Sequence, residues 1–438
     1  MWFSPLLMFL LLILFILLKI PVAFALLLTS TVFTMLFLGL EGLYLLVNGF
    51  FNTMSNWAFT AVIPFIFMSA LMDECGMGID MFQALQKIFG KGKIAYIMIV
   101  TCLSYMISLM SGAVASALSI LALLVYPSMI KIGFPQKLVT GFILVAGSLP
   151  QLIPPSLNMI MYGLYTETSI GKLFAGGLGT GSLMAALFTL YTYMYLTFKK
   201  ISLASTEIKT GEVDLREKIK ALKNFVGPFV IILVTLGSIY RGIATPTEAA
   251  SLGAITTLIY AGFRKRLTLT VLKKCLLTTL RTTSFIFFIV SASISFGAVF
   301  SALGGKSLVR DLITSFPSAY AHILTIALAI TLVFLLGMFL ETFSITIILG
   351  PLFHPIITGF GYDPIWWGVI FCTILLTGFI TPPVGMSLYI FKNLRPEVPW
   401  NVIYGSVWPY VLLMVITVIT SIIFPEIITF FVRMLTGR

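Results

Sequence analysis

Apolar runs long enough to form membrane helices recur along the whole chain, separated by short polar stretches or by glycines and prolines. A helix needs about 20 apolar residues to cross a bilayer, and a soluble core does not require so many such runs. The pattern therefore predicts an all-α polytopic membrane protein. The first run, residues 3–18, resembles the core of a signal peptide. Because Lys19, Ile20 and Pro21 follow it in place of a small-residue cleavage site, we interpret it as a retained span.

The prolines and glycines repeat when the chain is shifted by 228 residues. The shift pairs Pro127 with Pro355, Gly133 with Gly361, Gly76 with Gly304, Ser116 with Ser344, Pro154 with Pro382 and Pro155 with Pro383. Any two hydrophobic chains share leucines, whereas prolines and glycines are scarcer and mark helix ends. We therefore predict two structural repeats, residues 1–198 and 225–438, joined by a polar cytoplasmic linker at 199–224.

Each repeat is expected to contain two spans, an amphipathic surface arm, a third span, a re-entrant hairpin, a helix that breaks at Pro-Pro, and a last span. In the first repeat these lie at 3–18, 22–38, 41–58, 61–80, 94–124, 137–149 and 173–198. In the second they lie at 225–240, 248–263, 267–282, 283–303, 322–352, 365–379 and 402–424. We assign 3–60 and 225–282 to scaffold spans, and 94–170 and 322–391 to transport elements.

The net charge of +12 is informative once the chain is placed in a membrane. Lys and Arg gather in cytoplasmic loops of membrane proteins. When the two repeats are traced in opposite orientations, 21 of the 27 basic residues fall on one side. That side is predicted to be cytoplasmic, which places both termini in the periplasm. The basic charge thus indicates orientation, and no nucleic-acid partner is expected.

Several function classes lack their motifs in this sequence, of which 59% is hydrophobic and 10% charged. There is no HExxH, GxxxxGK[ST] or GxSxG, so a zinc protease or a nucleotide-driven pump is excluded, and no nucleotide is expected. The four cysteines are scattered without a CxxC and are interpreted as small hydrophobic residues. The acidic residues are also scattered, which makes an intramembrane enzyme the least favoured alternative.

The two Pro-Pro breaks are the candidate functional sites. A proline pair stops a helix and leaves carbonyls of the preceding turn without donors, which costs several kcal/mol each in lipid. A cation offsets this cost, and the helix that restarts points its positive end at an anion. Inverted repeats with broken helices are typical of secondary transporters. We therefore predict one Na⁺ cage where the tip 108–112 meets the break 147–156, and another where 337–342 meets 378–385.

Other polar residues admit structural interpretations. Glu341 lies in the second tip, where a carboxylate is either functional or hydrogen-bonded within the tip. Residues 245–248, Thr-Pro-Thr-Glu, form a capping box for the next helix. His322 and His354 lie beside the second hairpin and are interpreted as structural.

Four stretches carry a resemblance to a known family: Ile20-Pro-Val-Ala-Phe-Ala25, Gly242-Ile-Ala-Thr-Pro-Thr-Glu-Ala-Ala250, Ile153-Pro-Pro-Ser156 and Thr381-Pro-Pro-Val-Gly385. They resemble the large membrane subunit of TRAP (tripartite ATP-independent periplasmic) transporters. The resemblance implies an elevator-type Na⁺ symporter of the bacterial inner membrane. Its substrate would be an organic acid, such as a C4-dicarboxylate, a sialic acid or a sugar acid, delivered by a periplasmic binding protein. A small four-helix membrane subunit is expected as a separate chain.

The resemblance also implies which residues hold two Na⁺ ions, mainly through backbone oxygens. The first site would use Ser108, Ser111, Pro150, Ile153 and Pro155, and the second Gly337, Gly378, Thr381 and Val384. The sequence departs from the family at Pro150, where glycine is usual, and in the less polar tip 113–116. Substrate contacts are expected from Ser156, Asn158, Glu341, Thr381 and Ser387. A sodium- or proton-coupled carboxylate carrier without a binding protein is the alternative.

Overall fold

The computed structural model describes residues 3–90, 92–199 and 215–437, and its regular structure in these ranges is entirely helical. The helices of the first half are α1 (Phe3–Leu17), α2 (Val22–Phe37), α3 (Leu43–Ser55), α4 (Val62–Glu74), α5 (Met77–Phe89), α6 (Lys93–Ser111), α7 (Val114–Ile120), α8 (Tyr126–Ile132), α9 (Gln136–Ser148), α10 (Leu157–Thr166) and α11 (Ile170–Phe198). A π-turn at Leu121–Val125 joins α7 to α8.

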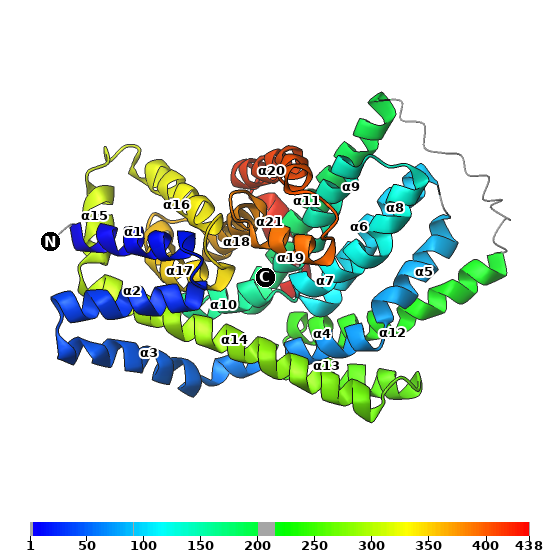
Figure 1. Cartoon of the computed structure of the whole chain (residues 1–438), viewed down its shortest axis with the longest axis horizontal. Helices are drawn as coiled ribbons and strands as arrows, with labels where there is room; N and C mark the ends of the chain where they lie inside the picture. The colour runs from blue at the N-terminus through cyan, green and yellow to red at the C-terminus, as the bar shows by residue number, and fades with distance from the viewer. Residues whose placement is uncertain (1–2, 91, 200–214, 438) are drawn as a thin grey trace.

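The helices of the second half are α12 (Leu215–Tyr240), α13 (Pro246–Phe263), α14 (Leu269–Ala302), α15 (Gly305–Thr314), α16 (Ala321–Gly337), α17 (Thr342–Gly359), α18 (Pro364–Ile380), α19 (Met386–Leu394), α20 (Trp400–Ile423) and α21 (Glu426–Thr436). The second half follows a similar order, with α14 in place of α3 and α4, α17 in place of α7 and α8, and α21 added at its end (Figure 1). Among the described residues, seven helical segments are long and apolar enough to cross a membrane, or eight if one bent pair counts as a span. The expected all-α polytopic class is confirmed.

Backbone landmarks coincide under the 228-residue shift. Gly76 and Gly304 both have left-handed φ, at 69° and 88°, and each precedes a short helix. Gly133 and Gly361 are also left-handed, at 99° and 89°, directly after the second arm of each hairpin. Both Pro-Pro peptide bonds are cis. The element order therefore agrees with the shift read from the sequence, while the opposite orientation of the halves and an elevator motion stay predictions.

The largest difference from the expected elements concerns the arms. The predicted arm 267–282 and span 283–303 form one helix, α14, of 34 residues. The matching segments of the first half, residues 40–55 and 59–74, are bent by 60° at the break between them. No glycine or proline interrupts residues 269–296, so nothing in that sequence ends the helix. The separation of the second arm from its span was wrong.

Three further expectations need correction. The linker predicted at 199–224 is helical from Leu215 onward, because α12 begins there; residues 200–214 lie outside the described ranges. The third span, predicted at 61–80, ends at Glu74, and left-handed Gly76 starts the separate helix α5. The short helices α5, α15 and α21 were not predicted, because each has a polar face that makes it less apolar than a span.

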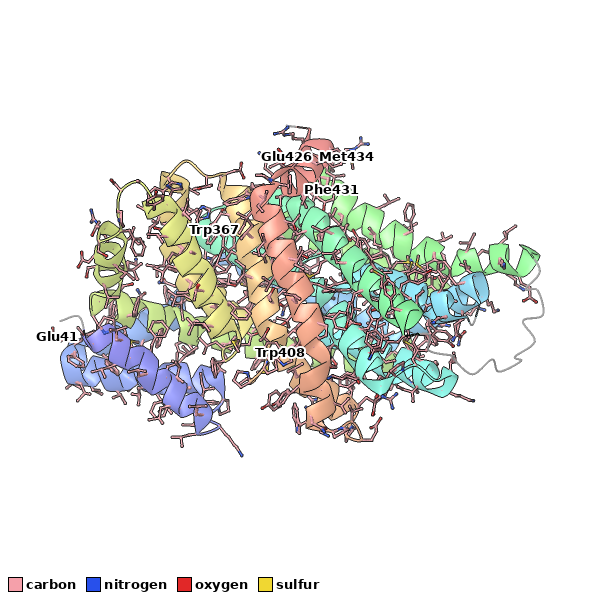
Figure 2. The ribbon with its side chains drawn as sticks, turned by 90° about the horizontal axis from the view of Figure 1, so that it is seen from above. Glu41, Trp367, Trp408, Glu426, Phe431 and Met434 are labelled. Atoms are coloured by element: carbon pink, nitrogen blue, oxygen red, sulfur yellow. The ribbon has the colours of Figure 1, made fainter. Side chains whose placement is uncertain are left out.

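The broken helices lie at the centre of the molecule. Every residue of α18 from Ile365 to Ile380 is buried, and α9 is buried from Leu138 to Ser148. Both helices pack against α20, whereas α14 contacts α2, α3 and α4 on one side and α17 on the other. Figure 2 shows α21 at the end of α20, where the labelled Glu426, Phe431 and Met434 lie together at one edge. This arrangement places the first Pro-Pro break inside the protein, since Pro154 and Pro155 are buried, whereas at the second break Pro382 is half-buried and Pro383 is exposed.

The capping box at the start of α13 is confirmed. The backbone N–H of Thr245 donates to the Glu248 carboxylate at 2.8 Å, and the Glu248 N–H donates to the Thr245 hydroxyl at 3.3 Å. We expect Thr245→Ala to lower the free energy of unfolding by ~1 kcal/mol, because it leaves a helix N–H without its partner. Denaturant unfolding checks this. Ser251→Ala, which removes an exposed hydroxyl within the same helix, is the control and should be near neutral. Equal effects of the two changes would contradict the capping role.

Candidate functional site: two junctions between hairpin tips and helix breaks

The second hairpin tip touches the second break backbone to backbone. A Cβ built on Gly378 would lie 2.9 Å from the Gly337 Cα, and one built on Gly337 would lie 3.1 Å from the Gly378 Cα. Both residues are glycine because any side chain would force α16 and α18 apart. Beyond the break, the Gly385 N–H donates to the Met338 carbonyl at 3.3 Å. The tip is thus fixed to both sides of the break, and it brings together the predicted residues of the second sodium site.

Carbonyl oxygens accumulate at this junction. The Gly378 carbonyl accepts from the Thr381 N–H at 3.0 Å. Within the described ranges, no hydrogen-bond donor reaches the carbonyls of Gly337, Thr381 or Val384. Gly337 and Thr381 are buried. Val384 is half-buried. Buried carbonyls are nearly always paired, so the two unpaired ones of Gly337 and Thr381 favour a ligand that accepts oxygen coordination.

The first junction has the same construction. A Cβ built on Gly112 would overlap the Pro155 carbonyl, so only glycine lets this tip approach the break so closely. About two turns earlier, the Ser104 hydroxyl of α6 donates to the Ala146 carbonyl of α9. The hairpin and the broken helix are therefore joined beside the first Pro-Pro pair as well.

The predicted ligands of the first site converge in part. The carbonyls of Pro150, Ile153 and Pro155 are buried and receive no donor from the described part of the chain. Ser108 is fully buried, its hydroxyl donates to the Ser104 carbonyl at 2.7 Å, and its own carbonyl accepts from Gly112 at 3.4 Å. Ser111 is the last residue of α6, and its side chain lies outside the described residues.

Pro150, where the resemblance to the family led us to expect glycine, fits its position. It lies in a 3₁₀ turn at Leu149–Gln151, near the start of the turn, where no backbone N–H is required. Its carbonyl receives no donor from the described part of the chain, and α9 ends before it at Ser148. The substitution therefore keeps the oxygen and fixes φ, so the first junction retains its carbonyl cluster.

Asn158 lies between the two junctions. Its side chain is 3% exposed, and its Oδ1 accepts from the Thr346 hydroxyl of the second hairpin at 2.8 Å. Its Nδ2 is buried with no partner among the described residues, and the same holds for the hydroxyl of Ser344. Because the Thr346 bond orients the amide, Nδ2 is the atom presented as a donor. Asn158 is thus a buried donor where the first break faces the second hairpin.

The other expected substrate contacts bond within their own segments. Ser156 caps α10, since its hydroxyl accepts from the Met159 N–H at 3.3 Å and donates to the Gln151 carbonyl at 2.5 Å. Thr381 donates to the Thr377 carbonyl at 2.6 Å, and Ser387 to the Phe379 carbonyl at 3.2 Å. A direct role of these three side chains in substrate binding stays a prediction.

In this conformation the Glu341 carboxylate is hydrogen-bonded within the hairpin tip, which is one of the two roles that the sequence left open. It is the N-cap of α17, and its carboxylate accepts from the Phe343 N–H at 2.8 Å and from the Thr342 hydroxyl at 3.3 Å. Both bonds lie within the hairpin tip. A carboxylate held this way stabilises the start of α17 and helps to fix the shape of the tip.

Sequence reasoning missed Thr346, Ser344 and Gln151. All three lie within apolar segments, and Thr346 meets Asn158 only because α10 packs against α17. The available signal was the alternation of hydroxyl residues Thr342, Ser344 and Thr346 in an otherwise apolar run.

His354 and His322 have structural surroundings, as expected. His354 joins the second hairpin to the end of α10 through hydrogen bonds with the Tyr162 hydroxyl at 2.9 Å and the Thr168 hydroxyl at 3.4 Å. The ring of His322 packs against the rings of Phe360 and Tyr362.

Comparison with known proteins agrees with this arrangement. The C4-dicarboxylate TRAP transporter large permease protein DctM of Pseudomonas aeruginosa is 28% identical over 368 residues, covering 81% of this chain and 83% of the relative. Its counterpart in Vibrio cholerae is 27% identical over 458 residues, covering 98% of each. The sialic acid TRAP transporter large permease protein SiaM of Vibrio cholerae is 26% identical over 416 residues, covering 93% of each.

The fold has a solved counterpart, and a family model spans nearly the whole chain. The crystal structure of the Alcanivorax borkumensis YdaH transporter superposes with a TM-score of 0.60 over 96% of this chain and 98% of that chain, at 15% identity, which bears on the fold alone. The family model described as "Tripartite ATP-independent periplasmic transporter, DctM component" matches residues 9–427. The chain therefore belongs to the large permease component of TRAP transporters, which are secondary transporters and not enzymes.

Proposed function

We propose that this chain is the large permease subunit of a Na⁺-coupled symporter that imports an organic acid across the bacterial inner membrane. The acid is of the C4-dicarboxylate, sialic acid or sugar acid type, the classes named for several relatives. A periplasmic binding protein delivers it, and a separate small four-helix subunit completes the membrane complex. Members of the family work with both kinds of partner.

The observation that carries the proposal is the pair of carbonyl clusters at the junctions. Six carbonyls, three at each break, receive no donor in the described part of the chain. Leaving such groups unpaired inside a membrane protein costs several kcal/mol each, and a cation bound among them offsets that cost. A carboxylate is not needed, because Na⁺ is a hard cation and carbonyl oxygens suit it. Two clusters, one at each junction of a hairpin tip with a helix break, support two ions.

The organic acid would bind between the two junctions. The buried Asn158 Nδ2 supplies a donor, and α10 and α19 both start there, directly after the two breaks. Their N–H groups and positive helix ends suit a carboxylate. Sodium at either break adds positive charge beside the same position, which explains how ion and acid would be coupled.

The transport elements would move as one body. The first and second hairpins are tied to the broken helices by the contacts at Gly112 and Gly378, whereas α14 lies along their edge and packs mainly on α2, α3 and α4. The predominance of these contacts over the one between α14 and α17 supports a mobile domain and a scaffold, as an elevator mechanism requires.

Sodium binding can be tested without knowing the acid. We expect the purified complex to unfold at a higher temperature in NaCl than in KCl of equal ionic strength, because an ion that binds the folded state stabilises it. At a concentration of 100 times Kd the stabilisation is ~2.7 kcal/mol per site. Uptake into proteoliposomes should then require a Na⁺ gradient and no ATP. The same unfolding temperature in both salts, with Na⁺-independent uptake, would overturn the proposal. Uptake without the binding protein would favour the simpler carboxylate carrier.

A further inference from the structure

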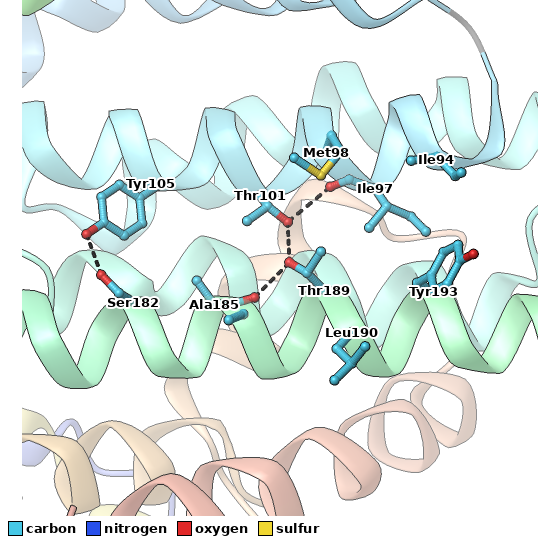
Figure 3. Close-up of a pocket in the computed structure, with 11 residues that line it drawn as sticks. Ile94, Ile97, Met98, Thr101, Tyr105, Ser182, Ala185, Thr189, Leu190 and Tyr193 are labelled. Atoms are coloured by element: carbon cyan, nitrogen blue, oxygen red, sulfur yellow. Dashed lines mark hydrogen bonds between the residues drawn. The ribbon is translucent and has the colours of Figure 1, made fainter. Parts of the chain in front are cut away.

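Two apolar cavities adjoin around α6, on the outside of the first hairpin. One, of about 500 Å³, lies between α6 and α11 (Figure 3). The other, of about 400 Å³, is lined by residues of α5, α6 and α12. Thr101 and Tyr105 line both. The cavities therefore run along the seam between the α6–α11 pair and the α5–α12 pair, at the end of the molecule where Ile94, Phe89 and Leu222 lie.

The polar atoms in this seam are already paired. The Thr101 and Thr189 hydroxyls lie 2.6 Å apart, and Thr101 donates on to the Ile97 carbonyl at 3.0 Å. The Tyr105 and Ser182 hydroxyls lie 2.8 Å apart, as Figure 3 shows. These bonds join α6 to α11 and leave the walls apolar. A bound water needs two to four polar partners, so neither water nor a polar solute is favoured here.

The volume of the cavities distinguishes between two apolar molecules that could fill them, a partner helix and a lipid acyl chain. A helix with its side chains is a cylinder about 10 Å across with a 5.4 Å pitch, which is about 420 Å³ per turn. The larger cavity would hold little more than one turn, too short for a partner helix. A flexible acyl chain is narrower and fits a volume of this kind. Ile94 is 58% exposed and Leu190 53%, so the larger cavity opens at the surface, where lipid chains have access.

Each of the four helices carries a lysine next to residues that line the cavities or at the helix end beside them, since Ile88, Ile94 and Leu222 are lining residues. These are Lys87 on α5, Lys93 on α6, Lys199 at the end of α11 and Lys223 on α12. Lys93 donates to the Leu196 carbonyl at 2.9 Å, which holds its charge at the rim between α6 and α11. The Lys199 ammonium lies 4.9 Å from the centre of the Tyr195 ring, on the same rim.

Acidic residues are few in the described parts of these four helices. The described parts of the four helices carry two acidic residues, Asp80 and Glu217. Asp80 is paired with Arg264 and Arg266 at 3.0 and 2.7 Å. Four basic residues at one end of an apolar groove attract an anionic lipid headgroup, each contributing ~1 kcal/mol near the surface.

We propose that an anionic phospholipid binds in this seam, with acyl chain in the two cavities and its headgroup on Lys87, Lys93, Lys199 and Lys223. The lysines lie on the side that the charge bias predicts to be cytoplasmic, so the lipid belongs to the inner leaflet. The site does not involve the transported acid or either sodium cluster. It lies where the first hairpin and α11 face α5 and α12.

The test uses the full chain with any membrane subunit that co-purifies, reconstituted into nanodiscs of equal phosphatidylglycerol and phosphatidylcholine. Native mass spectrometry then counts retained lipids. We expect the wild-type protein to retain phosphatidylglycerol in preference to phosphatidylcholine. Lys199→Gln should lower this preference about fivefold, the equivalent of ~1 kcal/mol. Lys172→Gln, which removes a lysine from the first turn of the same helix, is the matched control and should leave the preference unchanged.

A second variant tests the cavity itself. Ala186 lines the larger cavity and is exposed within it, so Ala186→Trp should fill the space and abolish lipid retention while the unfolding temperature stays unchanged. If that variant fails to fold, the comparison of Lys199→Gln with Lys172→Gln still tests the proposal. Wild-type protein that retains no lipid, that retains both lipids equally, or that carries a peptide mass in place of lipid would overturn the proposal.

Discussion

Gly378→Ala is expected to weaken sodium binding strongly. The new Cβ would lie 2.8 Å from the Phe334 carbonyl oxygen and 2.9 Å from the Gly337 Cα. Both are backbone atoms of α16, so no side chain can rotate out of the way, and the hairpin tip must move off the break. Overpacking of this kind costs ~1–3 kcal/mol. If that strain falls on the ion-bound state, the Kd for Na⁺ rises about 5- to 150-fold.

The measurement is the rise in unfolding temperature on titration with NaCl against KCl, followed by Na⁺-driven uptake. Gly237→Ala is the matched control, because a Cβ at that helical glycine would meet nothing within 4 Å. It should bind Na⁺ like the wild-type protein. A Gly378→Ala protein with unchanged Na⁺ affinity would show that the Gly337–Gly378 contact does not shape an ion site.

Asn158→Asp is expected to abolish uptake while Na⁺ binding persists. The aspartate keeps an oxygen that accepts from the Thr346 hydroxyl, as Asn158 Oδ1 does at 2.8 Å in the wild-type protein. It replaces the unpartnered Nδ2 donor with a second oxygen, which repels the carboxylate of the acid. A hydrogen bond to a charged group contributes ~1.5–3 kcal/mol, so loss of the donor alone predicts about 10- to 150-fold lower uptake, before repulsion is added.

Initial rates over a range of acid concentrations test this prediction. Thr358→Val is the control, because it removes a hydroxyl of the same hairpin helix, α17, that donates only to the His354 and Pro355 carbonyls of that helix; it should retain uptake. The salt-dependent unfolding temperature of Asn158→Asp verifies that the ion sites are intact. Normal uptake by Asn158→Asp would exclude Asn158 as the contact to the acid.

Much of the fold could be predicted because its markers are local. Prolines end helices and left-handed glycines cap them regardless of what packs around them, so Gly76, Gly133 and the two Pro-Pro pairs located helix ends and fixed the register between the halves. The continuity of α14 through residues 282–283 could not be predicted from such local markers. Its boundary at 282–283 carries no breaking residue, and the arm was separated from the span because its leucines recur at helical spacing among basic residues, as in a helix at the membrane surface.

Some features of the candidate site could likewise be predicted from the sequence, and others could not. The backbone clusters at the breaks follow from the proline pairs, which any reader of the sequence can see. The partner of Asn158 does not, because Thr346 lies 188 residues away and reaches it only through the packing of α10 on α17. Side chains such as Ser156 and Ser387 are polar for a local reason, since they satisfy backbone groups beside a break. Composition alone does not separate such residues from ligand contacts.

The straight helix α14 and the bent pair α3–α4 occupy matching places in two halves that share a register. The same kind of segment is thus one continuous helix in the second half and two helices in the first half, with the bend between residues 55 and 59. The shape of each is set by neighbours as well as by its own sequence. The two halves therefore share the order of their elements but not the shape of this segment. The second hairpin packs against a continuous helix, and the corresponding segment of the first half is bent.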